Sequence, residues 1–151
     1  DRSVSRGLGD VYKRQRMGDP ETQPIMMRVK SDFSVVVEAA IQGRLDTAEI
    51  EWDRRTALGV VSAARGYPMH PEKGAVIEKL PVNTELTHTF HAGTKLNSDG
   101  LITVSGGRVL CTVGLGENVS TARSVAYAAM EDVIFDGKQF RTDIGYRALN
   151  R

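Results

Sequence analysis

The stretch at residues 57–64, ALGVVSAA, decides the fold. It is a continuous run of small apolar residues, which is typical of a buried strand. Residues 108–115, RVLCTVGL, predict another buried strand. Gly66-Tyr67-Pro68 ends the first run and Gly106-Gly107 precedes the second, so turn formers bound both. Residues 69–86 hold most of the remaining turn formers, and we expect a long surface connection there.

Weaker strand patterns lie on either side of the first run. Ile50 and Trp52 alternate with acidic residues, which predicts a strand with one polar face. Residues 87–94, THTFHAGT, alternate again and predict a further strand. The sequence NSDG at residues 97–100 predicts a hairpin turn, with residues 101–104 as its return strand.

Apolar residues at spacings of three and four predict helices near both ends of the chain. Within residues 23–42 these are Ile25, Met26, Val29, Phe33, Val36, Val37, Ala40 and Ile41. Because Ser31 or Asp32 could cap a second helix there, one broken helix and two short ones are both open. Residues 120–133 predict another helix, and a short element follows in residues 140–149. This order predicts an α+β fold with a mainly antiparallel sheet.

The composition excludes several classes of protein. The 151 residues suit one domain, or one small domain with an appendage, and Lys and Arg exceed Asp and Glu by only one. Such a balance gives no general attraction to nucleic acid or membranes, and no apolar run is long enough to cross a bilayer. Cys111 is the only cysteine, which fits a reducing, cytoplasmic location. His70, His88 and His91 lack the spacing of a zinc site, so we expect no metal ligands.

A loop at residues 16–28, RMGDPETQPIMMR, is the first candidate for ligand binding. Its charged residues are Arg16, Asp19 and Glu21, its backbone is shaped by Gly18 and Pro20, and its other polar side chains are Thr22 and Gln23. Charges of both signs in a turn-prone segment before a helix indicate a ligand-facing loop. A solvated loop with a helix cap is the alternative.

Two further segments combine chemistry with turn formers. Gly106-Gly107-Arg108 could bring the backbone close to a ligand and present a guanidinium to phosphate or carboxylate. A glycine turn followed by an edge arginine explains the same residues. Arg141, Thr142 and Asp143 could line a polar site, or could form an Asp-capped short helix with a weak surface ion pair.

Five ordered blocks resemble one enzyme family. They are RMGDPETQPIMMRVKSD, WDRRTALGVVSAARGYP, FHAGT, SGGRVLCTVGLG and FRTDIGYRAL, and they cover the chain from Arg16 to its end. In the same order they are similar to the C-terminal region of the phosphoribosylamine–glycine ligases. The resemblance implies that residues 16–45 are the C-terminal end of an ATP-grasp domain. It implies that residues 46–151 are a small C-terminal domain, mainly antiparallel, that resembles a rudimentary hybrid-sandwich motif.

The resemblance also implies an activity in purine biosynthesis. Enzymes of this family use ATP to phosphorylate the glycine carboxylate. The amine of 5-phosphoribosylamine then displaces phosphate from the glycyl phosphate to give glycinamide ribonucleotide. Mg²⁺, or Mn²⁺, neutralises charge on the nucleotide. The partners implied are glycine, 5-phosphoribosylamine and the missing N-terminal and ATP-grasp regions, with no nucleic acid and no membrane.

The resemblance assigns roles to the candidate residues. Arg16 is expected to stabilise charge on the acyl phosphate, and Asp19 and Glu21 to orient the incoming amine or the ribosyl hydroxyls. The residues expected to contact substrate are Gly18, Pro20, Thr22, Gln23, Gly106, Gly107, Arg108, Thr142 and Asp143.

The chain departs from the family just before the first block. The family places a Glu and an Asn, both Mg²⁺ ligands, where this sequence has Tyr12 and Arg14, and neither side chain suits a hard cation. Residues 1–15 are therefore expected to be disordered or foreign to the domain. Without the nucleotide-binding parts we expect a fragment that is inactive alone and binds no cofactor. The alternative is a stand-alone α+β module for binding or assembly.

Overall fold

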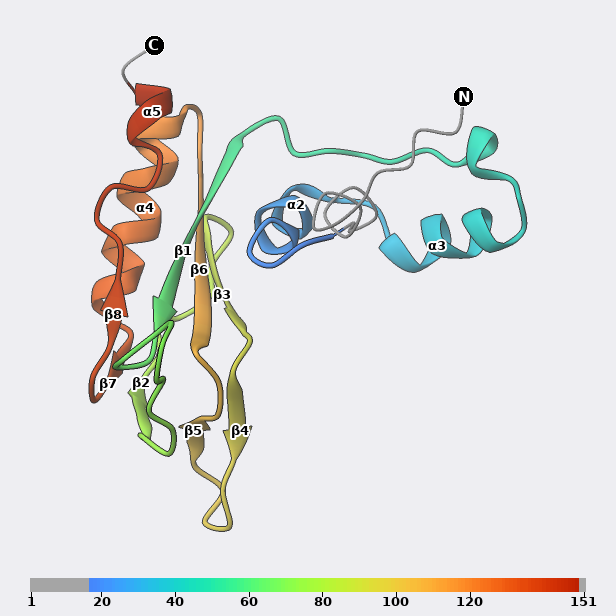
Figure 1. Cartoon of the computed structure of the whole chain (residues 1–151). Helices are drawn as coiled ribbons and strands as arrows, with labels where there is room; N and C mark the ends of the chain where they lie inside the picture. Colours follow the sequence, from blue (N-terminus) through green and yellow to red (C-terminus); the bar gives the residue numbers. More distant parts are fainter. Residues whose placement is uncertain (1–16, 150–151) are drawn as a thin grey trace, which may run out of the picture.

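The structure, a computed structural model, describes residues 17–149 (Figure 1). Its helices are α2 (Thr22–Arg28), α3 (Phe33–Ile41), the 3-10 helix η1 (Leu45–Thr47), α4 (Val119–Glu131) and α5 (Tyr146–Leu149). Its strands are β1 (Thr56–Ala63), β2 (Ile77–Lys79), β3 (Thr87–His91), β4 (Thr94–Leu96), β5 (Ile102–Val104), β6 (Arg108–Gly116), β7 (Ile134–Phe135) and β8 (Gln139–Phe140).

The main sheet has the strand order β3-β6-β1-β8. Strands β1 and β6 pair antiparallel from Thr56 opposite Gly116 to Ala63 opposite Arg108. Two smaller sheets, β2-β7 and β4-β5, are also antiparallel. The prediction of helices with an antiparallel sheet is confirmed, and the two apolar runs are its central strands.

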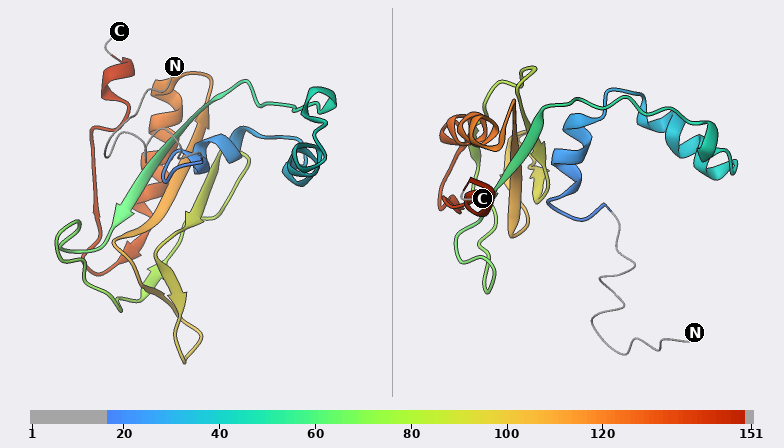
Figure 2. Two further views of the ribbon diagram at one scale, coloured as in Figure 1. Left: turned by 45° about the vertical axis from the view of Figure 1, so that its right-hand side comes forward. Right: turned by 90° about the horizontal axis from the view of Figure 1, so that it is seen from above.

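Helix α4 covers one face of this sheet (Figures 1 and 2). Its buried residues Ala122, Ala126 and Met130 pack in the core beside β1 and β6. A Cβ added at Gly114 would lie 2.5 Å from the Ala122 carbonyl oxygen, and one at Gly116 would lie 2.4 Å from the Ala122 nitrogen. The two glycines of β6 therefore let the helix backbone approach the strand directly.

Helix α2 covers part of the opposite face. Here a Cβ on Gly59 would lie 3.0 Å from Cys111 Sγ and 3.1 Å from Pro24 Cγ. The absence of a side chain at Gly59 therefore lets the Pro24 ring of α2 pack against β1. Cys111 is buried, as the sequence indicates. Burial, with a smaller contribution from the Asp19 charge, raises the pKa of its thiol to about 12. The thiol is therefore a packing group rather than a nucleophile.

Asp53 and Arg55 form an ion pair that stabilises the backbone directly before β1. The Arg55 guanidinium donates to both carboxylate oxygens of Asp53, at 3.0 Å to Oδ1 and 2.6 Å to Oδ2. These bonds hold the pKa of the buried Asp53 carboxyl well below its usual range. Arg28, at the end of α2, donates from Nε to the Asp53 carbonyl at 3.1 Å. One aspartate thus joins α2 to β1.

The segment between α2 and β1 projects from the sheet (Figure 2). Residues 23–42 form two short helices, α2 and α3, rather than one broken helix, because Val29 ends α2 and Asp32 caps α3 by accepting from Ser34 N at 2.9 Å. The predicted strand at Ile50 and Trp52 is wrong: Trp52 makes only an isolated bridge to Val29. No strand of the described residues lies beside it to extend the ladder.

Two other differences arise from long-range pairing. The connection at residues 69–86 contains β2, which pairs with β7 through Ile77 and Phe135. The strand predicted at residues 87–94 is divided into β3 and β4 at Gly93, where an added Cβ would lie 2.5 Å from the Arg108 carbonyl oxygen. Neither partner is visible in the local pattern. The hairpin turn at residues 97–100 and the helix after Asn118 are confirmed.

Substitution of Gly114 by alanine tests the close approach of the α4 backbone to β6. The new methyl group has no room against the α4 backbone, so we expect Gly114→Ala to lower the free energy of unfolding by about 2–3 kcal/mol. Urea denaturation measures this change. Ser120→Ala, at an exposed position of α4, is the control and should shift it by less than about 0.5 kcal/mol. Equal stability of the two variants would contradict the close approach.

The Asp53–Arg55 pair predicts an acid-sensitive stability. Because folding lowers the Asp53 pKa, the pair stabilises fully above the pKa of an unfolded aspartate, about 3.9, and this contribution is lost as the pH falls through the lower folded value. We expect the free energy of unfolding, from urea titrations between about pH 6 and about pH 2, to fall less steeply in Asp53→Asn. Arg55→Gln should also lose the steeper acid slope. The same dependence of the unfolding free energy on pH in all three proteins would show that the Asp53–Arg55 pair does not cause the acid sensitivity.

Candidate functional site

The loop before α2 is folded by its own polar side chains. Gly18 N donates to Glu21 Oε1 at 3.0 Å, and Thr22 Oγ1 donates to the Gly18 carbonyl at 2.7 Å. Gln23 Nε2 lies 3.3 Å from Asp19 Oδ1. These bonds shape the turn that carries Asp19, whereas Glu21, the N-cap of α2, makes no side-chain capping bond to the helix. Arg16, like Tyr12 and Arg14, lies outside the described residues.

Arg108 brings two of the candidate segments together. Its Nη1 donates to the Asp19 carbonyl at 3.0 Å, and its Nε lies 3.2 Å from Asp19 Oδ2. The two residues are 89 positions apart in the sequence. Both side chains are 41% exposed, so the pair remains accessible to a ligand. The prediction that both segments contact one substrate stays a prediction, but the fold places them in contact.

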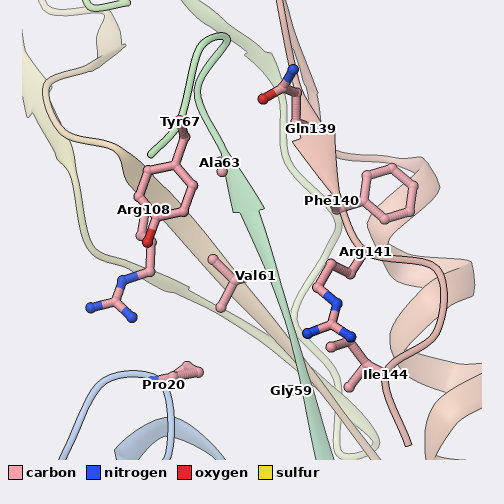
Figure 3. Close-up of a pocket in the computed structure, with 10 residues that line it drawn as sticks. All are labelled: Pro20, Gly59, Val61, Ala63, Tyr67, Arg108, Gln139, Phe140, Arg141 and Ile144. Atoms are coloured by element: carbon pink, nitrogen blue, oxygen red, sulfur yellow. The ribbon is translucent and has the colours of Figure 1, made fainter. Parts of the chain in front are cut away.

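A cavity of about 490 Å³ opens beside this pair on the α2 face of the sheet (Figure 3). Its lining residues are Pro20, Gly59, Val61, Ala63, Tyr67, Arg108, Gln139, Phe140, Arg141 and Ile144. The floor is the apolar face of β1, and an arginine stands on either side. This arrangement suits a small ligand with an anionic group and a less polar body.

The glycines at 106 and 107 do not present open backbone to this cavity. A Cβ on Gly107 would lie 2.6 Å from Tyr67 Cδ2, and one on Gly106 would lie 3.1 Å from Gly93 Cα. Protein atoms therefore fill the space that these glycines create. Tyr67 itself lines the cavity, a role that sequence reasoning missed by treating Gly66-Tyr67-Pro68 only as the end of a strand. The available signal in the sequence was the pair Gly106-Gly107, because glycines can leave room for an aromatic ring such as that of Tyr67.

The segment after β8 forms the other wall. Arg141 lines the cavity and donates to Asp143 Oδ1 from Nε at 2.9 Å and to Oδ2 from Nη2 at 2.7 Å. These bonds lower the Asp143 pKa. The Thr142 carbonyl accepts from Arg123 Nη2 at 2.7 Å, and the Arg141 carbonyl accepts from the Tyr127 hydroxyl at 2.6 Å. Arg141 thus reaches the cavity, while its two predicted neighbours shape the wall behind it.

The described part of the chain offers no cluster of metal ligands. Residues 17–149 contain no group of three or more His, Cys, Asp or Glu side chains placed to hold a metal ion. Within β3, His88 instead packs against Phe90, with ring centroids 4.5 Å apart, and His91 Nδ1 lies 3.0 Å from Thr94 Oγ1. Among these same residues no helix is long and apolar enough to cross a membrane.

Comparisons with known proteins agree on one family. The family model "Phosphoribosylglycinamide synthetase, C domain" matches residues 57–147. The phosphoribosylamine–glycine ligase of Ralstonia nicotianae is 59% identical over 136 residues, which are 90% of this chain and 32% of that protein. The enzymes of that name from Neisseria meningitidis serogroup A and Escherichia coli O157:H7 are 54% and 51% identical, with the same shares covered.

A solved structure shares the fold. The crystal structure of phosphoribosylamine–glycine ligase from Thermotoga maritima matches with a TM-score of 0.68 at 40% identity, over 85% of this chain and 31% of that one. The chain thus spans about a third of the length of the relatives it matches. Because the family model covers more than half of the chain and these relatives are highly identical to it, the chain belongs to the phosphoribosylglycinamide synthetase C-domain family.

Proposed function

We propose that this chain is the C-terminal part of an ATP-dependent carbon–nitrogen ligase of purine biosynthesis that acts in the cytoplasm. The complete enzyme joins glycine to 5-phosphoribosylamine through a glycyl phosphate and gives glycinamide ribonucleotide. The names of the relatives support the activity. The observation that carries the site is the contact of Arg108 with Asp19 at the edge of the cavity, since it unites two segments expected to bind one substrate.

The cavity would receive the ribosyl substrate. Arg108 and Arg141 supply positive charge, and the β1 floor supplies an apolar surface for the sugar. Asp19 and Glu21 would orient the amine or the ribosyl hydroxyls, and Arg16 would stabilise charge on the acyl phosphate. Gly18, Pro20, Thr22 and Gln23 hold the loop, and Gly106, Gly107, Thr142 and Asp143 hold the walls. Positioning of this kind is the main contribution a binding domain makes to such a transfer.

The described residues do not fit ATP with Mg²⁺. The divalent ion prefers several carboxylate or amide oxygens around it, and no suitable cluster exists among residues 17–149. Phosphoryl transfer depends on such a metal-centred arrangement. The missing N-terminal and ATP-grasp regions would therefore provide the residues that bind ATP and Mg²⁺. Without them, this chain alone would be inactive.

The projecting segment would belong to the ATP-grasp domain. In this division, residues 16–45 end that domain, and residues 46–151 form the C-terminal domain with its hybrid-sandwich resemblance. Helix α3 and η1 expose the apolar side chains Val35, Val37, Ile41 and Leu45. The missing regions would cover them. The same exposed face favours the second candidate, a stand-alone module for binding or assembly, in which another protein covers it.

Activity of a chimaeric enzyme tests the proposal. The N-terminal two thirds of the Ralstonia nicotianae ligase, joined to residues 17–151, should release phosphate in the presence of ATP, Mg²⁺, glycine and phosphoribosylamine. The 151-residue chain alone should not. In the chimaera, Arg108→Gln should raise KM for phosphoribosylamine about tenfold, because a charged hydrogen bond is lost, while KM for ATP is retained.

Lys95→Gln is the matched control, since this cation lies on the β4–β5 hairpin outside the cavity lining. It should leave both constants unchanged. Phosphate release by the isolated chain would contradict its predicted inactivity. An unchanged KM for phosphoribosylamine in Arg108→Gln would show that the cavity is not part of the substrate site.

A further inference from the structure

Tyr67 is held at the cavity by a tightly bonded turn. Tyr67 N donates to the Ala64 carbonyl at 3.1 Å, and His70 N donates to the Gly66 carbonyl at 2.8 Å. Gly66 has a φ of 78°, and a Cβ there would lie 2.3 Å from the His70 carbonyl oxygen, so the turn requires glycine at this position. The backbone that carries the tyrosine is therefore fixed before any ligand arrives.

The tyrosine ring is fixed as well, by its contact with Gly107. Ring atoms Cδ2 and Cε2 lie 2.6 Å and 3.0 Å from the position of a Cβ on that glycine. The Gly107 carbonyl in turn accepts from Ala64 N at 2.9 Å, so the turn and the start of β6 are bonded together. Arg108, directly after Gly107, is the first residue of β6, and Figure 3 shows that it and Tyr67 both line the cavity. One rigid unit thus positions both side chains.

Both side chains have donor capacity that residues 17–149 leave unused. Within that range, the Tyr67 hydroxyl makes no hydrogen bond, and the residue is 40% exposed. Arg108 donates from Nη1 to the Asp19 carbonyl and pairs through Nε with the Asp19 carboxylate, and none of the described residues accepts a hydrogen bond from Nη2. A phenol O–H and a guanidinium N–H that line one cavity can both donate to an oxyanion.

The opposite wall is less suited to bind an anion. Arg141 already donates from Nε and Nη2 to both oxygens of Asp143, so its charge is matched by a carboxylate in a two-bond arrangement. The Asp19 carboxylate also repels an anion, but its contact with Arg108, Oδ2 to Nε at 3.2 Å, is weaker than the pair of hydrogen bonds between Arg141 and Asp143. The two walls therefore differ, and an anionic group is favoured beside Tyr67.

We propose that Tyr67 and Arg108 form the subsite for the phosphate monoester of a ribosyl phosphate. The sugar then lies over the apolar floor at Gly59 and Val61, toward Arg141. This inference rests on the proposed function, which it extends by giving the substrate a direction in the cavity and by adding Tyr67 as a binding residue. Tyr67 contributes through its hydroxyl, whereas its ring supports the wall.

Binding of ribose 5-phosphate to the 151-residue chain tests the subsite. Calorimetric titration should show that ribose 5-phosphate binds and that ribose binds at least tenfold more weakly, since ribose lacks the anion. Tyr67→Phe keeps the ring on Gly107 and should weaken ribose 5-phosphate about tenfold while leaving the thermal midpoint unchanged. Gly107→Ala, which displaces the ring, should weaken it at least as much. Failure of ribose 5-phosphate to bind, or equal affinity in Tyr67→Phe, would overturn the subsite.

The chimaeric enzyme separates this inference from the proposed function. There, Tyr67→Phe should raise KM for phosphoribosylamine about tenfold and leave kcat unchanged, because the phosphate group takes no part in bond making. If Arg108→Gln raises this KM and Tyr67→Phe does not, the subsite is refuted and the proposed function stands. If neither variant changes it, both are refuted. Lys95→Gln again serves as the charge control.

Discussion

Strands β1 and β6 pair along their whole length, and a helix packs closely on each face of this pair, α4 through its backbone and α2 through the Pro24 ring. Gly114 and Gly116 admit α4 on one face, and Gly59 admits α2 through Pro24 on the other. A side chain at Gly114 or Gly116 would displace the α4 backbone, and one at Gly59 would press on Cys111 and the Pro24 ring. The same strand face that receives α2 continues as the floor of the cavity, so the depth of the cavity is set by the packing that sets the fold.

Because this packing holds the fold together, the Asp19–Arg108 pair is not needed for stability and is available to bind a ligand. An exposed ion pair contributes at most about 1 kcal/mol to stability, because water screens it and two long side chains lose freedom. Helix α2 does not depend on that contribution: Pro24 packs beside Gly59, and Arg28 is bonded to Asp53. A ligand that takes over the Arg108 guanidinium would therefore cost the fold little. The Asp53–Arg55 pair is the opposite case, since loss of Arg55 leaves the charge of the buried Asp53 without compensation.

The sequence predicted the elements whose signals are local. The apolar runs of β1 and β6, the period of α4 and the turn at residues 97–100 need no knowledge of distant residues, and all are confirmed. Strand β2, the break at Gly93 and the single bridge of Trp52 to Val29 depend on whether a partner strand lies alongside, which no local pattern records. In the site, the Asp19 loop and Arg108 were predicted as candidates. Tyr67 was not, because its turn was interpreted only as a strand end. Arg141 was grouped with Thr142 and Asp143, and a sequence cannot tell which of three neighbours faces a cavity.

The projecting segment connects the two functional interpretations. Val35, Val37, Ile41 and Leu45 are each at least 42% exposed, although burying an aliphatic side chain of this size stabilises by about 1.5–3 kcal/mol. A segment with this much exposed apolar surface gains little from the domain that carries it, and it gains much from any surface that covers it. It is joined to α2, and α2 is joined to the loop that holds Asp19. In the proposed function, whatever covers α3 would therefore lie next to the segment that leads to Asp19, so the covering surface and the proposed substrate site would be parts of one arrangement.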